Sequence, residues 1–118
     1  MFFKLGRNVS PSVFAEDYER TLEIIKSNHS NARVCLVNIP DRDIYLKPRA
    51  IEFNRIIDTA AECAGESFFV ANLFESRLQG DFYYMNTLDG LHPDEDGMRI
   101  IADVIEAAIV KKYTANKA

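Results

Sequence analysis

An aspartate and a histidine three residues apart are the residues of this sequence best suited to chemistry. Asp89 and His92 lie in "TLDGLHPDEDGMRIIADVI", residues 87–105, just before a run with the pattern of an amphipathic helix. A carboxylate beside an imidazole can hold one tautomer of the ring and stabilise the imidazolium that forms when the ring takes a proton from a nucleophile. The pair therefore suggests a general base. The alternative is a turn residue beside a well-capped helix, because Asp-Gly is a turn signal.

Residues near the N-terminus are suited to stabilising negative charge on oxygen. An asparagine side chain, or a glycine backbone N–H, in a loop after a strand can donate to a developing oxyanion. Asn8 and Gly6 follow the short apolar stretch 1–5 and are candidates for this role. Ser10 lies in the same loop and is a candidate nucleophile facing His92, although a serine before a proline also fits a helix N-cap.

The elements that must position these residues alternate along the chain. Apolar runs predict strands at 1–5, 34–39 and 67–71, and the last two are continuous, which is typical of strands covered on both faces in a parallel sheet. Helical spacing of apolar residues predicts helices over 11–26, 53–64 and from about 93 onward, with an irregular segment before the last one. This alternation predicts right-handed crossovers and a parallel sheet flanked by helices.

The predicted fold class is α/β, with a short parallel sheet of about three strands in a three-layer α/β/α arrangement. At 118 residues the chain is expected to be a single domain over 1–118. In an open α/β sheet, ligands bind beyond the carboxyl ends of the strands. The segments 6–12, 40–46 and 72–92 each follow a strand, so we expect them to meet at one edge of the sheet, with Asp89 and His92 among them.

Several blocks of the sequence resemble the SGNH/GDSL hydrolases. "DGLHPDEDGMRIIA" is similar to the last block of that family, in which D-x-x-H-P precedes the terminal helix. "MFFKLGRNVS" resembles the earlier G-x-N-D block, in which a strand ends in a glycine and an oxyanion-hole asparagine. "ARVCLVNIP" and "FFVANLF" stand where the family has its fourth and fifth strands. The resemblance runs from residue 1 to about residue 110 and implies a flavodoxin-like SGNH fold, truncated at its N-terminal side.

This resemblance implies an ester hydrolase of the esterase, lipase or carbohydrate deacetylase kind. His92 would be the general base, Asp89 its orienting acid and Asn8 an oxyanion donor, with Gly6 as a further donor. The reaction would be acyl transfer from a small-molecule, lipid or carbohydrate ester to water. No metal and no organic cofactor would be needed.

Two departures from the family pattern concern the site. Val9 stands where the family usually has an aspartate, and the chain contains no G-D-S block, which in the family carries the nucleophilic serine upstream of G-x-N-D. The serine would then come from a partner, from an upstream segment, or from an unusual local residue such as Ser10. The alternative is a non-catalytic, homo-oligomeric α/β module derived from the family.

Composition narrows the classes of partner. Fourteen basic against eighteen acidic residues give a net charge of −4, without a basic cluster interleaved with aromatics, so nucleic acid is not an expected partner. No apolar run approaches the ~18 residues of a membrane span. The opening residues do not form a secretory signal, which makes the cytoplasm the default location, with secretion expected only if an upstream segment precedes them.

Two further expectations concern surfaces. In the family's strand order the strand at 1–5 would have an uncovered edge, and unpaired apolar edges associate. We therefore expect Met1 to Leu5 to pair with the same strand of another copy about a two-fold axis. The aromatic run at 82–84 would either line an acyl pocket or cover the core. The acids at 94–96 are explained by the positive end of the last helix rather than by a cation site.

Overall fold

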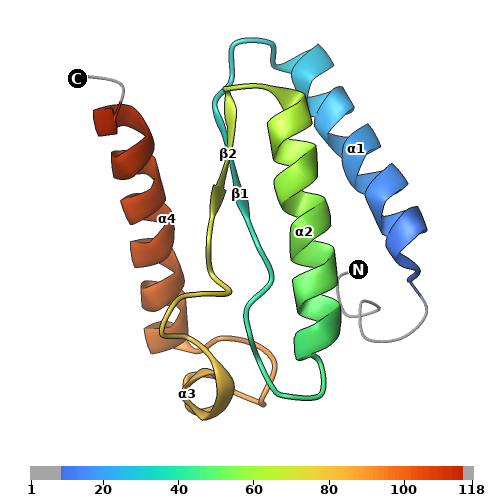
Figure 1. Ribbon diagram of the computed structural model, residues 1–118. Coiled ribbons are helices and arrows are strands. Elements are labelled where there is room, and N and C mark those ends of the chain that lie inside the picture. Colours follow the sequence, from blue (N-terminus) through green and yellow to red (C-terminus); the bar gives the residue numbers. More distant parts are fainter. Residues whose placement is uncertain (1–8, 116–118) are drawn as a thin grey trace.

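The computed structural model describes residues 9–115. Three long helices, one short helix and two strands follow one another in the order helix, strand, helix, strand, short helix, helix (Figure 1). Their bounds are α1 Pro11–Asn28, β1 Val34–Val37, α2 Lys47–Ala64, β2 Phe68–Ala71, α3 Gly80–Met85 and α4 Glu95–Ala115. The strand predicted at Met1 to Leu5, together with Gly6 and Asn8, lies outside the described residues.

Local signals account for the ends of the first two long helices. Ser10 caps α1 by accepting a hydrogen bond from the Val13 N–H at 3.2 Å, and Pro11 occupies the first turn, where its missing N–H costs nothing. Gly65 ends α2 with φ of +113°, a conformation that side chains with a Cβ rarely adopt. These two boundaries agree with the sequence signals.

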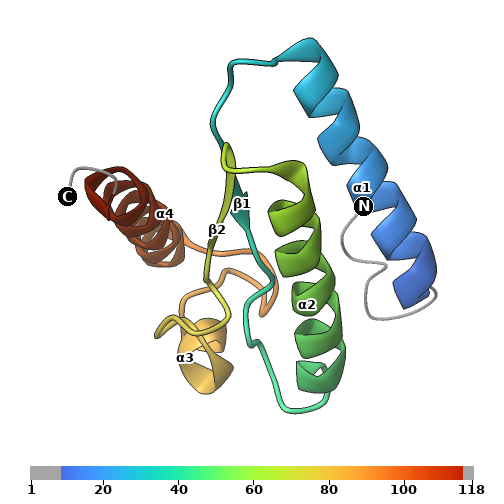
Figure 2. The same ribbon diagram turned by 45° about the horizontal axis from the view of Figure 1, so that its top comes forward.

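The described residues form a sheet of two parallel strands. β1 pairs with β2 from Val34 opposite Phe68 to Val37 opposite Ala71. α1 and α2 lie together on one side of these strands and α4 lies on the other, as both views show (Figures 1 and 2). The chain is therefore a mixed α/β fold that is mostly helical. The predicted α/β class and the parallel pairing are confirmed, whereas a third strand and the three-layer α/β/α arrangement remain predictions.

Two groups of buried apolar side chains hold the elements together. The first joins α1, β1, α2 and β2 through Leu22, Leu36, Ile57, Ala60, Ala61 and Phe68. The second joins α3, α4 and the segment after β2 through Leu73, Leu78, Tyr83 and Ile100. The second group lies at the end of the molecule to which the carboxyl ends of both strands point, beneath the segment that carries Asp89 and His92 (Figure 1).

Two helices differ from the sequence predictions. The sequence predicts an irregular segment where α3 forms. The six residues of α3 bury one side chain, Tyr83, and are too few to show a helical period. α2 begins at Lys47, upstream of its first strongly apolar turn, because Asp43 Oδ1 accepts the N–H groups of Tyr45 and Leu46 just before it. α4 begins at Glu95, in agreement with the predicted start near Pro93.

Candidate active site

The predicted pair lies in a closed loop between α3 and α4. The Asp94 N–H donates to the Asn86 carbonyl at 2.9 Å, and the Leu88 N–H donates to the His92 carbonyl at 2.9 Å. Between these two hydrogen bonds, Thr87 and Pro93 form an antiparallel bridge. Residues 88–92 are therefore held as a short loop whose two ends are tied together next to the first turn of α4.

Asp89 and His92 are in contact inside this loop. His92 Nδ1 lies 2.6 Å from Asp89 Oδ2, a distance typical of a charge-assisted hydrogen bond. The other carboxylate oxygen, Oδ1, accepts the backbone N–H groups of His92 at 2.7 Å and Leu91 at 2.9 Å. Gly90, with φ of +85°, allows the tight turn between the two residues. The carboxylate thus fixes both the turn and the imidazole ring.

The hydrogen bonds also fix the charge of Asp89. The backbone N–H of His92, the His92 ring and the backbone N–H of Leu91 together hold the pKa of the Asp89 carboxyl well below its usual range. The side chains of Asp89 and His92 are 53% and 60% exposed, so the pair lies on the surface. An ionised carboxylate on Nδ1 favours the tautomer with its proton on that nitrogen, which leaves the lone pair of Nε2 available as a base.

Tyr83 of α3 supports the loop from beneath. Its side chain is buried, and its hydroxyl donates to the Leu91 carbonyl at 2.9 Å. The Arg42 guanidinium, from the segment after β1, lies 5.8 Å from the Tyr83 ring centroid. The pKa of the Tyr83 phenol is raised, chiefly because the side chain is buried. The positive charge of Arg42 opposes this rise in pKa, and the negative charge of Asp89 adds to it.

Asparagines tie the carboxyl ends of the two strands together. Asn38, directly after β1, donates from Nδ2 to Asn72 Oδ1 at 2.9 Å, and Asn72 directly follows β2. Asn38 Oδ1 accepts the Phe74 N–H at 2.9 Å. Asn54 of α2 accepts the Ile39 N–H and donates to the Ile39 carbonyl, at 2.8 and 2.9 Å. Sequence reasoning missed these residues, although an asparagine directly after each strand was a visible signal.

Ser10 has a structural role in the described residues. Its Oγ caps α1 and lies 3.3 Å from Ser12 Oγ. The first turn of α1 and the loop between α3 and α4 lie on opposite sides of α2 in both views (Figures 1 and 2). Within residues 9–115, Asp89 is the one side chain that hydrogen bonds to the His92 ring. The oxyanion candidates Asn8 and Gly6 lie outside the described residues and remain predictions.

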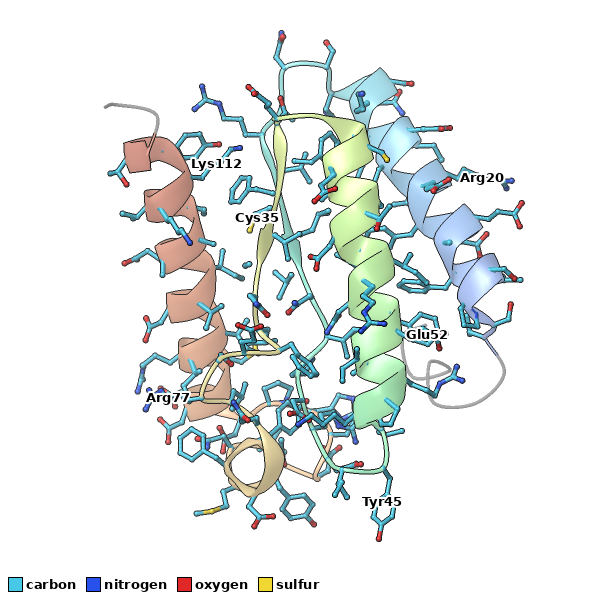
Figure 3. The ribbon with its side chains drawn as sticks, viewed as in Figure 1. Arg20, Cys35, Tyr45, Glu52, Arg77 and Lys112 are labelled. Atoms are coloured by element: carbon cyan, nitrogen blue, oxygen red, sulfur yellow. The ribbon has the colours of Figure 1, made fainter. Side chains whose placement is uncertain are left out.

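Large apolar side chains are exposed around this end of the molecule. They are Ile44 and Tyr45, from the segment before α2, and Tyr84, Met85 and Leu88, from α3 and the loop. Figure 3 shows Tyr45 pointing away from the body at this end. Of the aromatic run at 82–84, Tyr83 covers the core, whereas Tyr84 is 67% exposed and packs against Gly90.

Comparisons with protein-family models, with curated proteins and with solved structures gave no match for this chain. Of the helices described here, none combines the length and apolar content of a membrane span. Nor do residues 9–115 bring together three or more histidine, cysteine or acidic side chains that could hold a metal ion.

Proposed function

We propose that this chain carries the base-bearing part of an SGNH-type ester hydrolase site. The observation that supports the proposal most strongly is the 2.6 Å contact between Asp89 Oδ2 and His92 Nδ1, in a loop closed on both sides. Asp89 holds the ring, and His92 accepts a proton at Nε2 from the attacking hydroxyl or water and returns it to the leaving alcohol. The three-stranded, three-layer architecture of the family is part of the same proposal.

The position of the pair in the fold supports this function. Both residues lie at the end of the molecule to which the carboxyl ends of β1 and β2 point, where open α/β sheets bind their ligands. Asn8, and Gly6 beside it, would stabilise the oxyanion of the tetrahedral intermediate. The nucleophilic serine comes from a partner, from an upstream segment or from a local residue such as Ser10. The substrate is a small-molecule, lipid or carbohydrate ester.

Hydrolysis of p-nitrophenyl acetate by the purified chain tests the base directly. After the buffer reaction is subtracted, His92→Ala should lower the rate by about two orders of magnitude. Asp89→Asn should also lower the rate. The second histidine provides a matched control: His29 is exposed at the C-cap of α1, so His29→Ala should leave the rate unchanged. If the wild-type chain hydrolyses the ester above the buffer reaction, equal rates for all three variants would contradict the proposal.

A fluorophosphonate probe then locates the nucleophile. Intact mass of the treated wild-type chain should show one adduct if the serine belongs to this chain, and the adduct should be lost in His92→Ala. Ser10→Ala tests the local candidate by the same readout. A folded chain that forms no adduct places the nucleophile outside these residues, on a partner or on an upstream segment.

The second candidate function is a non-catalytic, homo-oligomeric module. The exposed apolar side chains of Ile44, Tyr45, Met85 and Leu88 favour it, because several large apolar side chains exposed at one end of a molecule are typical of interaction sites. The sequence prediction for the contact between copies is the strand Met1 to Leu5, which lies outside the described residues. Light scattering that shows a monomer at micromolar concentration would count against this candidate.

A further inference from the structure

A groove of about 490 Å³ lies between β2 and the C-terminal half of α2. β2 contributes Phe68, Phe69 and Val70 to its wall. α2 and the turn after it contribute Asp58, Glu62 and Glu66. The groove therefore combines a strand with a row of carboxylates, away from the loop of Asp89 and His92.

The strand in this groove has an open edge in the part of the chain that the structure describes. β2 pairs with β1 alone, and the Val34 and Asn38 N–H groups donate to the carbonyls of Ser67 and Ala71. Successive residues of a strand direct their peptide groups to opposite sides, so those of Phe68 and Val70 point away from β1. The Phe68 N–H already donates to the Gly65 carbonyl. Figure 1 shows the sheet nearly edge-on, with β2 towards the viewer between α4 and α2.

The charge beside this edge is uncompensated. Across residues 9–115, Asp58, Glu62 and Glu66 take part in no ion pair. Burial, followed by the charges of Glu62 and Glu75, raises the pKa of the Asp58 carboxyl. Like charges therefore meet here without a cation between them. A second copy of this edge would bring the same carboxylates face to face, which disfavours self-pairing.

We propose that the outer edge of β2 binds an extended peptide segment in which basic residues alternate with apolar or neutral ones. The segment adds a strand to the sheet, hydrogen bonding to the Phe68 carbonyl and to both peptide groups of Val70. Its side chains alternate between the two faces of the sheet. Those on the α2 face meet Asp58, Glu62 and Glu66, which selects lysine or arginine. Those on the α4 face meet Phe69, whose ring packs against Tyr113 at 6.1 Å.

The probe is the peptide acetyl-Lys-Thr-Lys-Val-Lys-Thr-amide, added to the ¹⁵N-labelled full chain at low ionic strength. The Val70 amide resonance should shift on binding, and the dissociation constant follows from the titration. The same peptide with N-methyl groups on every residue has no N–H left to donate to the strand and should not bind. A peptide with glutamate in place of lysine should not bind either.

Two pairs of substitutions distinguish binding in the groove from non-specific attraction of a basic peptide to an acidic protein. Glu62→Gln with Glu66→Gln should weaken binding by about 2- to 30-fold, and added salt should weaken it further. Glu16→Gln with Glu19→Gln removes the same charge from the exposed face of α1 and should leave the affinity unchanged. The proposal is overturned if the Val70 amide does not respond, if the N-methylated peptide binds equally well, or if both variant pairs have the same effect.

Discussion

Asp89 binds His92 twice, once through each carboxylate oxygen. Oδ1 accepts the His92 backbone N–H at 2.7 Å, and Oδ2 lies 2.6 Å from the ring nitrogen Nδ1. One carboxylate thus sets both the backbone of the turn and the orientation of the ring. For this reason, a side chain that is half exposed can still hold the imidazole in one position.

The loop is expected to lose order in acid. Because folding lowers the pKa of Asp89, its stabilisation of the turn is fully present above the pKa of the unfolded chain, about 3.9, and is lost as the pH falls through the lower folded value. Amide hydrogen exchange at Leu91 and His92 should therefore accelerate, relative to a peptide reference, below about pH 4. In Asp89→Asn this acid transition should be absent. The same transition in wild type and variant would show that another group causes it.

Gly97→Ala should destabilise the protein. A Cβ at this position would collide with the Asn86 carbonyl oxygen and would lie 3.1 Å from Pro93 Cβ. Helix propensity alone would favour alanine by about 1 kcal/mol, whereas overpacking costs about 1–3 kcal/mol. A backbone oxygen that also anchors the Asp94 N–H cannot move aside cheaply. We expect the free energy of unfolding, measured in urea, to fall.

The neighbouring residue provides the control for this substitution. Met98→Ala alters an exposed side chain in the same turn of α4 and should change the unfolding free energy by less than about 0.5 kcal/mol. An increase in stability for Gly97→Ala, which helix propensity alone predicts, would contradict the close contact with Asn86.

Tyr83→Phe should loosen the Asp89–His92 loop without disturbing the core. The ring stays buried, but the hydroxyl no longer donates to the Leu91 carbonyl. We expect a loss of about 1 kcal/mol in unfolding free energy and faster amide exchange in residues 88–92. Tyr84→Phe is the matched control, because Tyr84 is 67% exposed. Identical behaviour of the two variants would remove the support that we assign to the Tyr83 hydroxyl.

Sequence reasoning succeeded where the deciding interaction is local. Ser10 caps α1 by accepting the N–H of a residue three positions later. Gly65 ends α2 because it adopts a positive φ, and Asp89 reaches His92 across a single turn. It missed α3, whose formation depends on burial of Tyr83 against α4 rather than on its own six residues. It also missed the carboxamide contacts, since Asn38 and Asn72 are 34 positions apart and meet only when β1 and β2 pair.

The contacts of Asn54 with Ile39 are likewise formed between segments distant in sequence, and they can be tested by substitution. Its carboxamide accepts the Ile39 N–H and donates to the Ile39 carbonyl, and Asn54 itself is buried. Asn54→Leu keeps the volume but leaves both backbone groups without these partners, which should cost about 2 kcal/mol or more in unfolding free energy. Because Ile39 follows directly on Asn38, the damage should reach the carboxyl ends of the strands, detectable as faster amide exchange at Phe74.

A second substitution separates the two hydrogen bonds of Asn54. Asn54→Asp keeps an acceptor for the Ile39 N–H but loses the donor to its carbonyl and brings a second oxygen against it. Stability of this variant should therefore rise as the pH falls and the carboxyl becomes protonated, because the acid form can again donate. Asn31→Ala, at an exposed position, should be neutral. If Asn54→Asp showed no pH dependence relative to wild type, the donor half of the bridge would contribute nothing to holding α2 against the end of β1.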